Sequence, residues 1–324
     1  MRAIQYQSKE QPLALSLIDD PVAGIDEVIV NLKYSALNHR DVFITKGLYP
    51  NLRPGTVLGS DGVGEWQGKE YLINPNIDWG PDQQLPADEY HILGMPDDGT
   101  FAEKIAIHPD RLVRKPEHLT SSQAAALPLA GLTAYRVLFS RCQLSAEDRL
   151  LVNGIGGGVA LFVLQFALAI GAEVWITSSS QEKIDRARGI GATGGILYSE
   201  DNWHKSLKKN SGGFDVIIDS AGGAGFSQLI STANKGARIG IYGGSCGPIL
   251  NLSPQVIFWK HLNIFGSTMG SDQDFTAMVD FVDQYTIVPV VDSVFALADF
   301  KRGFDRMDHG LQFGKIVLDN RRLD

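Results

Sequence analysis

Hydrophobic and polar positions alternate with a period of two in the first part of the chain, most clearly in DEVIVNLKYSAL at residues 26–37. Such alternation is typical of half-buried β-strands. Glycine and proline interrupt the pattern repeatedly, which predicts short strands joined by turns. These interruptions are GLYPNLRPG, GSDGVG, NPNIDWGPD and MPDDGTF. Residues 1–120 are therefore predicted to form a β-rich module, either a barrel or another compact all-β unit.

The pattern changes after Thr120. Residues 121–139 are rich in alanine and leucine, which predicts a capped helix interrupted by Pro128. From Arg149 onward, apolar strands alternate with helices, and this predicts a parallel sheet covered on both faces. The predicted strands are 149–153, 173–177, 194–198, 214–220, 237–243 and 263–268, and the predicted helices are 160–171, 182–191 and 227–236.

Strands are predicted again at 287–297 and 314–318, with a helix at 299–309 between them. This order predicts an α/β protein in which a doubly wound parallel sheet is inserted into a β domain made from both ends of the chain. We expect the β domain to comprise residues 1–120 plus 286–324, and the inserted dinucleotide-binding domain to comprise 121–285.

The composition narrows the class of function. The chain has 324 residues, 44% hydrophobic and 20% charged, with a formal charge of −8. This acidic balance argues against nucleic acid or an anionic membrane as a partner. Apolar runs are too short to span a bilayer, the N-terminus lacks a signal-peptide pattern, and there are only two cysteines. We therefore expect a cytoplasmic enzyme that binds neither nucleic acid nor membrane.

A glycine-rich loop, GIGGGVA at 154–160, follows the first strand of the parallel sheet and precedes an apolar helix. Glycines there permit a sharp turn and let a pyrophosphate approach the amides at the helix N-terminus. No register satisfies the strict G-x-G-x-x-G/A fingerprint, so a purely structural turn is the alternative. The strand–loop–helix setting favours dinucleotide binding, with Gly156, Gly157, Gly158 and Val159 as contacts.

The second strand runs into TSSSQEK at 177–183, where an NAD-binding chain commonly carries an acidic residue. The first four of these side chains are uncharged and would not repel a 2′-phosphate. Ser178 and Ser179 can donate to phosphate oxygens, and Lys183 can add a cation, which predicts NADPH rather than NADH. A capping box of Ser179 with Glu182 is the alternative, and both roles are compatible at one helix end.

Two later strand ends carry further candidates for the cofactor site. Tyr198 ends the third predicted strand, where it is either a half-buried strand residue or a cover for the adenosine that reaches the 2′-phosphate. Gly243 and Gly244 end a later parallel strand. Strand ends near the topological switch point face a dinucleotide, so we expect close backbone approach at both glycines.

Several ordered motifs cover almost the whole chain: SALNHRDVFITKGLYP, VLGSDGVGEW, INPNIDWG, DGTFAEKIAI, AAALPLAGLTAYRVL, GIGGGVA and FGKIVL. Together they resemble the medium-chain dehydrogenase/reductase superfamily, and within it the zinc-free quinone oxidoreductase-like branch. The resemblance implies a GroES-like β-barrel catalytic domain that carries an inserted Rossmann domain. It also implies a homodimer and a small electrophilic acceptor as substrate.

The resemblance also implies where zinc would bind. Zinc-dependent members have a cysteine at the position of Asn38, a His–Glu pair at Ser60–Asp61 and a further cysteine near Leu129. Zinc requires thiolate, imidazole or carboxylate ligands, and of these positions only Asp61 offers one. No cysteine lies between residues 79 and 101, where the structural-zinc lobe would be. We therefore predict a protein without metal.

In zinc-free relatives, the polar positions of the substrate site correspond to Asn38 and Tyr49. Asn38 could hold the nicotinamide ribose or a substrate oxygen, while Tyr49 is either catalytic or a turn aromatic that closes against the β domain. A further tyrosine position of some relatives is Phe43 here, which lacks the hydroxyl. We expect His39 to be structural and Asp41 to brace the loop, so that protonation comes from water.

The resemblance places Thr133 near the nicotinamide phosphate or ribose, and Ser267 and Thr268 in the segment that faces the nicotinamide. The alternative for that segment is an edge strand, through which relatives commonly form dimers. Arg321 or Arg322 could reach the cofactor, with an exposed basic tail as the alternative.

These features predict a reductase that transfers hydride from NADPH to a quinone or an α,β-unsaturated carbonyl compound. One alternative is an aldehyde/ketone–alcohol oxidoreductase of the same superfamily. Another is a nucleotide-binding protein without catalysis, since some quinone oxidoreductase-like proteins are lens crystallins or bind RNA. The acidic balance disfavours RNA binding.

Overall fold

The computed structural model describes residues 1–321, and the chain divides into two compact units. Unit 1 comprises Met1–Leu132 and Ser271–Asp324, and unit 2 comprises Thr133–Gly270. The divisions fall after Leu132 and Gly270, whereas the predicted domain boundaries were 120/121 and 285/286. Among the described residues, no helix combines the length and the apolar composition that a membrane crossing needs.

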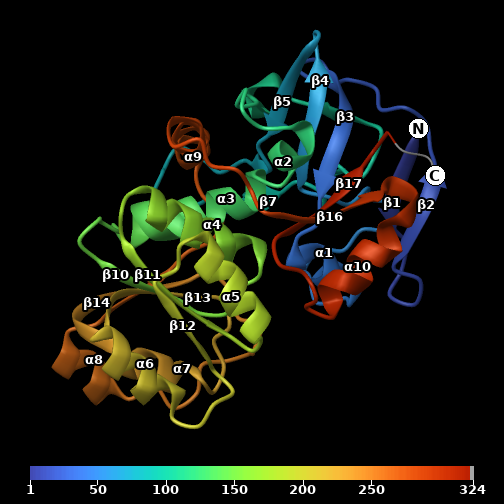
Figure 1. The fold of residues 1–324 in the computed structure, drawn as a ribbon. Helices are drawn as coiled ribbons and strands as arrows, with labels where there is room; N and C mark the ends of the chain where they lie inside the picture. The colour runs from blue at the N-terminus through green and yellow to red at the C-terminus, as the bar shows by residue number, and fades with distance from the viewer. Residues whose placement is uncertain (322–324) are drawn as a thin grey trace. The chain divides into compact units, whose positions relative to one another are not determined.

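Unit 2 is built on a parallel six-stranded sheet with the order β12-β11-β10-β13-β14-β15 (Figure 1). This is the strand order of the doubly wound dinucleotide-binding fold, with the reversal between β10 and β13. The predicted fold class is therefore confirmed. The strands are β10 (Arg149–Val152), β11 (Glu173–Ser178), β12 (Gly194–Leu197), β13 (Phe214–Asp219), β14 (Ala233–Ile241) and β15 (Asn263–Gly266).

Helices lie on both faces of this sheet, with α4 and α5 on one face and α6 and α7 on the other (Figure 1). Helix α4 is apolar almost throughout, and seven of its twelve residues are buried. The helices are α4 (Gly158–Ala169), α5 (Gln181–Ile190), α6 (Trp203–Ser211), α7 (Phe226–Ser231) and α8 (Pro254–Lys260), with a π-helical turn at Arg136–Arg141.

Two features of unit 2 differ from the sequence prediction. The helix predicted at 227–236 is wrong in its second half, because Ala233 pairs with Phe214 and begins strand β14. Helices α6 and α8 were not predicted. Helix α6 is short and largely polar, and helix α8 has only seven residues, none of them buried, so neither gives a strong local signal.

Unit 1 is built on a seven-stranded sheet with the order β16-β17-β3-β4-β5-β9, with β8 also paired to β3. Two small ladders, β1-β2 and β6-β7, accompany it. The β-rich module is thus completed by strands from the far end of the chain, as predicted. The strands are β1 (Arg2–Tyr6), β2 (Leu13–Leu17), β3 (Val28–Ala36), β4 (Asp61–Trp66), β5 (Lys69–Ile73), β6 (Asn76–Ile77), β7 (His91–Ile92), β8 (Lys104–Ile107), β9 (Leu112–Arg114), β16 (Val291–Ala296) and β17 (Lys315–Asp319).

The helices of unit 1 bury apolar side chains against this sheet. Thr120 and Gln123 form the capping box of α2, and Pro128 begins α3, so the predicted interruption is confirmed. Phe304 of α10 packs with Ile44 of α1 in one hydrophobic core. The helices are α1 (His39–Thr45), α2 (Ser121–Ala125), α3 (Pro128–Tyr135), which continues into unit 2, α9 (Asp272–Gln284) and α10 (Phe300–Asp308), with 3₁₀ turns at Pro109–Arg111 and Leu297–Asp299.

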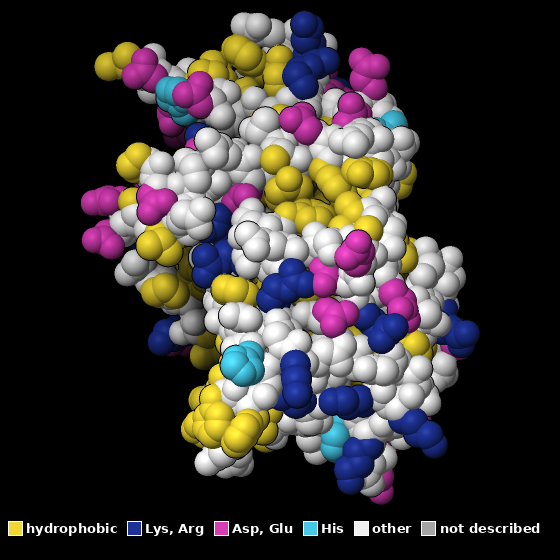
Figure 2. Space-filling view, turned by 90° about the vertical axis from the view of Figure 1, so that its left-hand side faces the viewer, with side chains coloured by type: hydrophobic (Ala, Val, Ile, Leu, Met, Phe, Trp, Pro, Cys, Tyr) yellow, Lys and Arg dark blue, Asp and Glu magenta, His cyan; other side chains and the backbone are white. Residues whose placement is uncertain are grey.

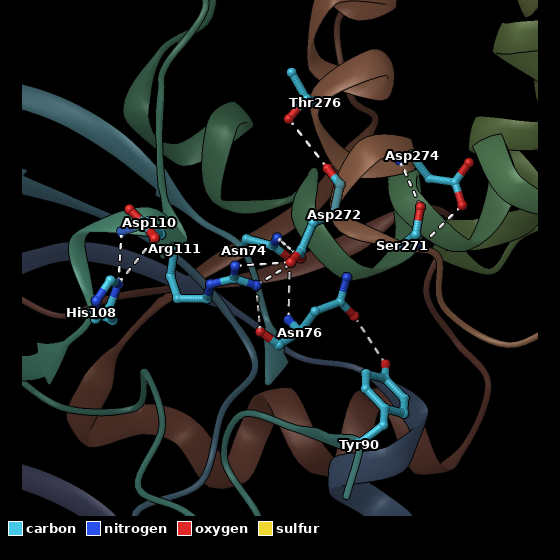
Figure 3. A network of polar contacts seen from close by, with 10 residues as sticks. All are labelled: Asn74, Asn76, Tyr90, His108, Asp110, Arg111, Ser271, Asp272, Asp274 and Thr276. Carbon is cyan, nitrogen blue, oxygen red and sulfur yellow. Dashed lines mark hydrogen bonds and ion pairs between the residues drawn. The ribbon is translucent and has the colours of Figure 1, made fainter. Parts of the chain in front are cut away.

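Helix α9, which was not predicted, begins where the chain returns to unit 1, and its first turn is held by a polar cluster (Figure 3). Arg111 donates to both carboxylate oxygens of Asp272 at 2.6 and 2.9 Å, and the Asn74 amide donates to one of them at 2.7 Å. Ser271 and Asp274 form the capping box of the same turn. These contacts fix the start of α9 on the β-rich module.

The antiparallel pairing of β17 with β3 places the end of the chain beside the candidate active-site residues. Val317 lies opposite Ala36 in this ladder. The register therefore brings Lys315, the first residue of β17, next to the turn that follows β3.

We expect the Asp292→Asn substitution to destabilise unit 1 by about 2–4 kcal/mol at neutral pH. The Asp292 side chain is 2% exposed and accepts hydrogen bonds from Arg306, Ser293 and the Phe313 amide. Burial alone would raise the pKa of Asp292, but these donors outweigh it and hold the pKa below its usual value. A depressed carboxyl pKa stabilises the fold above the unfolded pKa, and this contribution is lost as the pH falls.

The difference between wild type and variant should therefore shrink as the pH falls below about 4. Urea unfolding followed by circular dichroism at several pH values measures this. Asp280→Asn, on the exposed face of α9, is the control and should change little. A pH-independent difference would contradict the assignment.

Candidate functional site

The carboxyl edge of the unit 2 sheet is held by a polar network between three strand ends. Thr177 donates its hydroxyl to the Asn153 side-chain oxygen at 2.6 Å and accepts from the Gly154 amide at 3.0 Å. The Asn153 amide donates to Asp219 at 2.7 Å. Asp219 also accepts from two amides of the loop after β13. The network joins the ends of β10, β11 and β13 and so fixes the loops on both sides of the topological switch point.

The glycine loop has the backbone geometry that the sequence predicted. Gly154 and Gly156 have φ values of +77° and +131°, which favour glycine strongly. Gly157 is the N-cap residue of α4, which begins at Gly158 and has Val159 in its first turn. The first-turn amides of a helix have no partner within the helix. No protein atom lies within 4 Å of where a Cβ of Gly157 would be, so there is space beside these amides.

The serine turn lies next to this loop. A Cβ added to Gly156 would meet the Lys183 Cδ at 2.9 Å and its Nζ at 3.3 Å, so the lysine amine reaches the glycine loop. Ser178 is buried, with its hydroxyl accepting from the Ser180 amide, whereas Ser179 is exposed. The predicted cap at Ser179 is wrong by one residue: Ser180 is the N-cap and accepts from the Lys183 amide. The reason is that β11 continues through Ser178 and leaves fewer residues for the turn.

Tyr198 lies beside the serine turn, because its amide donates to the Ser178 carbonyl at 3.0 Å. Its side chain is 42% exposed, one residue beyond the end of β12. The structure thus brings Ser178, Lys183 and Tyr198 to one corner of the sheet, next to the glycine loop.

The remaining predicted cofactor residues follow β14 and β15. Gly243 packs closely on the loop after β13, since a Cβ there would lie 2.9 Å from the Ser220 carbonyl, while Gly244 is open. The Ser267 amide donates to β14, but its buried hydroxyl has no partner among the described residues. Thr268 is exposed.

Thr133 is buried, and its hydroxyl lies 3.9 Å from the sulfur of Met269. The structure therefore joins Thr133 to the GSTMG segment within unit 2. Arg321 binds Asp319 and Tyr34 within unit 1, which leaves its cofactor role without support, and Arg322 lies outside the described residues.

These observations fit a bound dinucleotide. The open helix N-terminus at Gly157 suits a pyrophosphate, the Lys183 amine supplies a cation next to it, and the unpartnered Ser267 hydroxyl offers a polar contact. The carboxylate at this edge, Asp219, is already satisfied by three donors.

The candidate catalytic residue Asn38 lies in a second polar network, which belongs to unit 1. Its side-chain amide donates to Asp61 at 3.0 Å, and its side-chain oxygen accepts from Lys315 at 2.7 Å. Lys315 also donates to Asp61 at 2.8 Å and to the Leu37 carbonyl at 2.7 Å. The other Asp61 oxygen accepts from the Leu129 amide at the start of α3. All of these side chains are buried, with Asn38 7% exposed.

Tyr49 is joined to the neighbouring Arg40 rather than to Asn38. The Arg40 guanidinium donates to the Tyr49 hydroxyl at 3.3 Å and lies 4.8 Å from its ring centroid. Arg40 also donates to Ser60 and to the carbonyls of Leu93 and Met95. Tyr49 is half-buried against the hydrophobic core of unit 1, as the alternative of a packed turn aromatic requires.

Asp41 is fully buried, and one of its oxygens accepts from the Asn38 amide while the other has no partner among the described residues. Burial raises the pKa of Asp41 to about 6, against the opposing effects of Arg40, this amide and Lys315. The carboxyl is therefore mostly ionised at neutral pH. His39 begins α1 with an exposed side chain.

These residues do not fit a zinc ion. Asn38 and Ser60 provide no thiolate or imidazole, and the Asp61 carboxylate is already bound by an amide side chain, a backbone amide and an ammonium group. Within residues 1–321, no group of His, Cys, Asp or Glu side chains has the arrangement of a metal site.

A groove of about 760 Å³ lies elsewhere on unit 1, with Asp78, Arg111 and Asp272 among its lining residues. Neither Asn38 nor Tyr49 lines it, so the groove is distinct from the predicted catalytic residues.

Sequence reasoning missed Lys315 and Arg40 as members of this site. A signal for Lys315 was available, since it opens the otherwise apolar run KIVL, whose residues are all buried. A charged residue at a buried strand position requires a partner of opposite charge.

Comparison with known proteins places the chain in a family. The family model described as zinc-binding dehydrogenase matches residues 158–284. The zinc-type alcohol dehydrogenase-like protein YogA of Leptosphaeria maculans is 32% identical, covering 95% of this chain and 94% of the relative. The acryloyl-coenzyme A reductase of Sulfurisphaera tokodaii is 27% identical, covering 98% and 99%.

Two solved structures are also similar. An NAD-dependent alcohol dehydrogenase has a TM-score of 0.92 and 32% identity, covering 98% of this chain and 99% of that one. The quinone oxidoreductase of Thermus thermophilus, also solved in complex with NADPH, has a TM-score of 0.83 and 25% identity, covering 98% and 100%. The extent and level of this identity mean that the chain belongs to the medium-chain dehydrogenase/reductase superfamily of oxidoreductases.

Proposed function

We propose that the protein is a reductase that transfers hydride from NADPH to a quinone or an α,β-unsaturated carbonyl compound without a metal ion. The observation that carries this proposal is the buried network of Asn38, Asp61 and Lys315, which leaves one Asn38 N–H without a partner inside the network and contains no zinc ligand set. An acceptor whose charge spreads onto an oxygen can be stabilised by such donors alone.

The preference for NADPH rests on the corner of unit 2 that carries Ser178, Ser179 and Lys183. The turn contains no carboxylate at residues 177–180, and the lysine amine lies beside the glycine loop. In this proposal Gly156, Gly157, Gly158 and Val159 hold the pyrophosphate at the start of α4, and Ser178, Ser179, Lys183 and Tyr198 surround the 2′-phosphate and adenosine.

NADPH, when bound, supplies the hydride, and the chain supplies orientation and electrostatic stabilisation. We assign Asn38 to donate a hydrogen bond to the acceptor oxygen as negative charge develops on it, with water as the proton source. Tyr49 is assigned to shape the acceptor site. Thr133, Gly243, Gly244, Ser267 and Thr268 are assigned to the nicotinamide half of the cofactor.

Similar proteins support both acceptor classes, because one is a quinone oxidoreductase solved with NADPH and another is an acryloyl-coenzyme A reductase. The second candidate is aldehyde/ketone–alcohol oxidoreduction, which the 32% identity to an NAD-dependent alcohol dehydrogenase favours. It ranks lower because the residues at Asn38 and Ser60 cannot hold the metal that would activate an alcohol.

We further propose that the protein is a cytoplasmic homodimer, formed by pairing of the β15 edges of two copies. Strand β15 has one neighbour in the unit 2 sheet and is mostly exposed. Phe258 and Trp259 of the adjoining helix α8 are 55% and 73% exposed. Figure 2 shows a hydrophobic cluster on the lower part of the molecular face toward the viewer. An unpaired edge with apolar flanks is a typical site of β-augmentation.

We expect NADPH oxidation with at least one compound from a panel of benzoquinones and enones, and much slower oxidation with saturated aldehydes. The assay follows the loss of NADPH absorbance and is run with and without a chelator, on protein whose zinc content has been measured. Equal rates in chelator and far less than stoichiometric zinc are expected. Activity that requires zinc would contradict the proposal. If NADPH is oxidised with none of the acceptors, the alternative of a nucleotide-binding protein without catalysis would be favoured.

The Lys183→Ala substitution should raise the Kd for NADPH about tenfold or more, because a charge-assisted contact with the 2′-phosphate is lost. The Kd for NADH should change less than about twofold. Fluorescence titration measures both constants, and Lys205→Ala, at an exposed position of α6, is the matched control. If the affinities for NADPH and NADH fall equally, Lys183 does not contact the 2′-phosphate.

Sedimentation velocity should show a dimer for the wild type and a monomer for Ile264→Asp, because a carboxylate on the β15 edge cannot be buried without a partner. Leu311→Asp, an exposed position of unit 1, should remain a dimer. A dimeric Ile264→Asp protein would place the interface elsewhere.

A further inference from the structure

We infer that Lys315 is a positioning residue whose buried ammonium group orients and polarises the Asn38 side-chain amide. This inference rests on the proposed function, in which Asn38 donates to the acceptor oxygen. It assigns the positive charge of the catalytic network to a residue on the last described strand of the chain.

The Lys315 ammonium group is fully engaged and isolated from water. The residue is 3% exposed, and its three N–H groups have three acceptors: the Leu37 carbonyl at 2.7 Å, the Asn38 oxygen at 2.7 Å and the Asp61 carboxylate at 2.8 Å. An ammonium group has three donors and no acceptor. These three contacts therefore fix the position of the ammonium group, which faces the side chains of Asn38 and Asp61.

The same contacts fix the orientation of the Asn38 amide. Lys315 can only donate, so the Asn38 atom that faces it is the oxygen. Ionised Asp61 can only accept, so the atom that faces Asp61 at 3.0 Å is the nitrogen. A flipped amide would lose both contacts and bring like groups together. The remaining N–H of Asn38 is consequently held in one direction.

Polarisation follows from this orientation. A cation bound to the amide oxygen draws electron density from the nitrogen, and the N–H groups become stronger donors, because linked hydrogen bonds reinforce one another in a low-dielectric site. The acceptor oxygen would thus experience the charge of Lys315 through the Asn38 amide. A metal ion would polarise the oxygen of the acceptor directly.

Charge balance supports this role. The buried charged groups of the cluster are the carboxylates Asp41 and Asp61 and the cations Arg40 and Lys315, all 8% exposed or less. Two negative and two positive charges leave the interior neutral. Arg40 is committed to Ser60, Tyr49 and backbone carbonyls, so Lys315 is the member of this pair that contacts Asn38.

The test is a double-substitution cycle between Lys315→Met and Asn38→Ala. Lys315→Met should lower kcat with the best acceptor about tenfold to about a hundredfold, the kinetic equivalent of one charge-assisted hydrogen bond. In the Asn38→Ala background the same substitution should change kcat less than about twofold, since Lys315 acts through Asn38. The Kd for NADPH should stay near its wild-type value, because the nucleotide contacts lie in unit 2.

Lys301→Met, an exposed lysine of α10, is the control for a lost lysine charge. If Lys315→Met does not fold, the double variant Asp61→Asn/Lys315→Met takes its place in the cycle. This variant removes the charges of both Asp61 and Lys315, so that neither is left buried without its partner. An equal loss of kcat from Lys315→Met with and without Asn38 would overturn the inference, because the lysine would then act independently.

A second readout separates this inference from the proposed function. In protein labelled with ¹⁵N-asparagine, the side-chain amide protons of Asn38 are identified by their absence from Asn38→Ala. In Lys315→Met these resonances should move upfield, while those of Asn320, another buried asparagine, stay in place. Unmoved Asn38 resonances would overturn the inference even if the protein reduces quinones. Shifted resonances in a protein that reduces no acceptor would support the polarised amide and refute only the proposed reaction.

Discussion

The buried ion pair of Lys315 and Asp61 is the interaction on which the unit 1 site depends. Removing two charges from water costs several kcal/mol, and the attraction between them compensates only if their other hydrogen-bonding groups are satisfied. Here they are, since Lys315 has three acceptors and Asp61 accepts from the Asn38 amide and the Leu129 amide as well. The pair joins β17, β4, the turn after β3 and the start of α3. The site can therefore form only when these strands pair in the observed register.

The nucleotide edge of unit 2 meets a different constraint. A dinucleotide brings its own negative charge, so the protein must leave donors open there. Thr177 and Asn153 connect the strand ends without adding charge, and the one carboxylate of the network, Asp219, is turned onto three donors of the protein. The amides at the start of α4 and the amine of Lys183 then lie at this edge beside the open space at Gly157. The buried cluster of unit 1 thus balances its charges internally, whereas in unit 2 Lys183 and the start of α4 lie together at the edge proposed for the nucleotide.

The sequence predicted what depends on local pattern. Apolar and alternating runs identified the strands of the unit 2 sheet and, in unit 1, strands β3, β16 and β17, whereas the other strands of unit 1 were expected only as short strands between turns. The glycine loop lies between β10 and α4, as predicted. Helices α6, α8 and α9 escaped prediction: α6 is largely polar, α8 has only seven residues, and the amphipathic pattern of α9 was not recognised. The contacts of Lys315 join residues 254 and 277 positions apart, which no local pattern encodes. The cap of α5 was misplaced by one residue because the length of β11 depends on its partner strands.

Membership in a superfamily whose family model is described as zinc-binding does not determine whether this chain binds zinc. The charge of Lys315, at the start of β17, bears more directly on whether zinc can bind. Because Arg40 and Lys315 already neutralise Asp41 and Asp61, an added divalent ion would leave a buried excess of two positive charges, with no thiolate to offset it. If the lysine were an apolar residue, Asp61 would instead be an uncompensated carboxylate beside Asn38, and a cation would lower the energy of the site. The lysine at the start of β17 thus adds an electrostatic reason to the missing ligands at Asn38 and Ser60 why this site does not suit a metal ion.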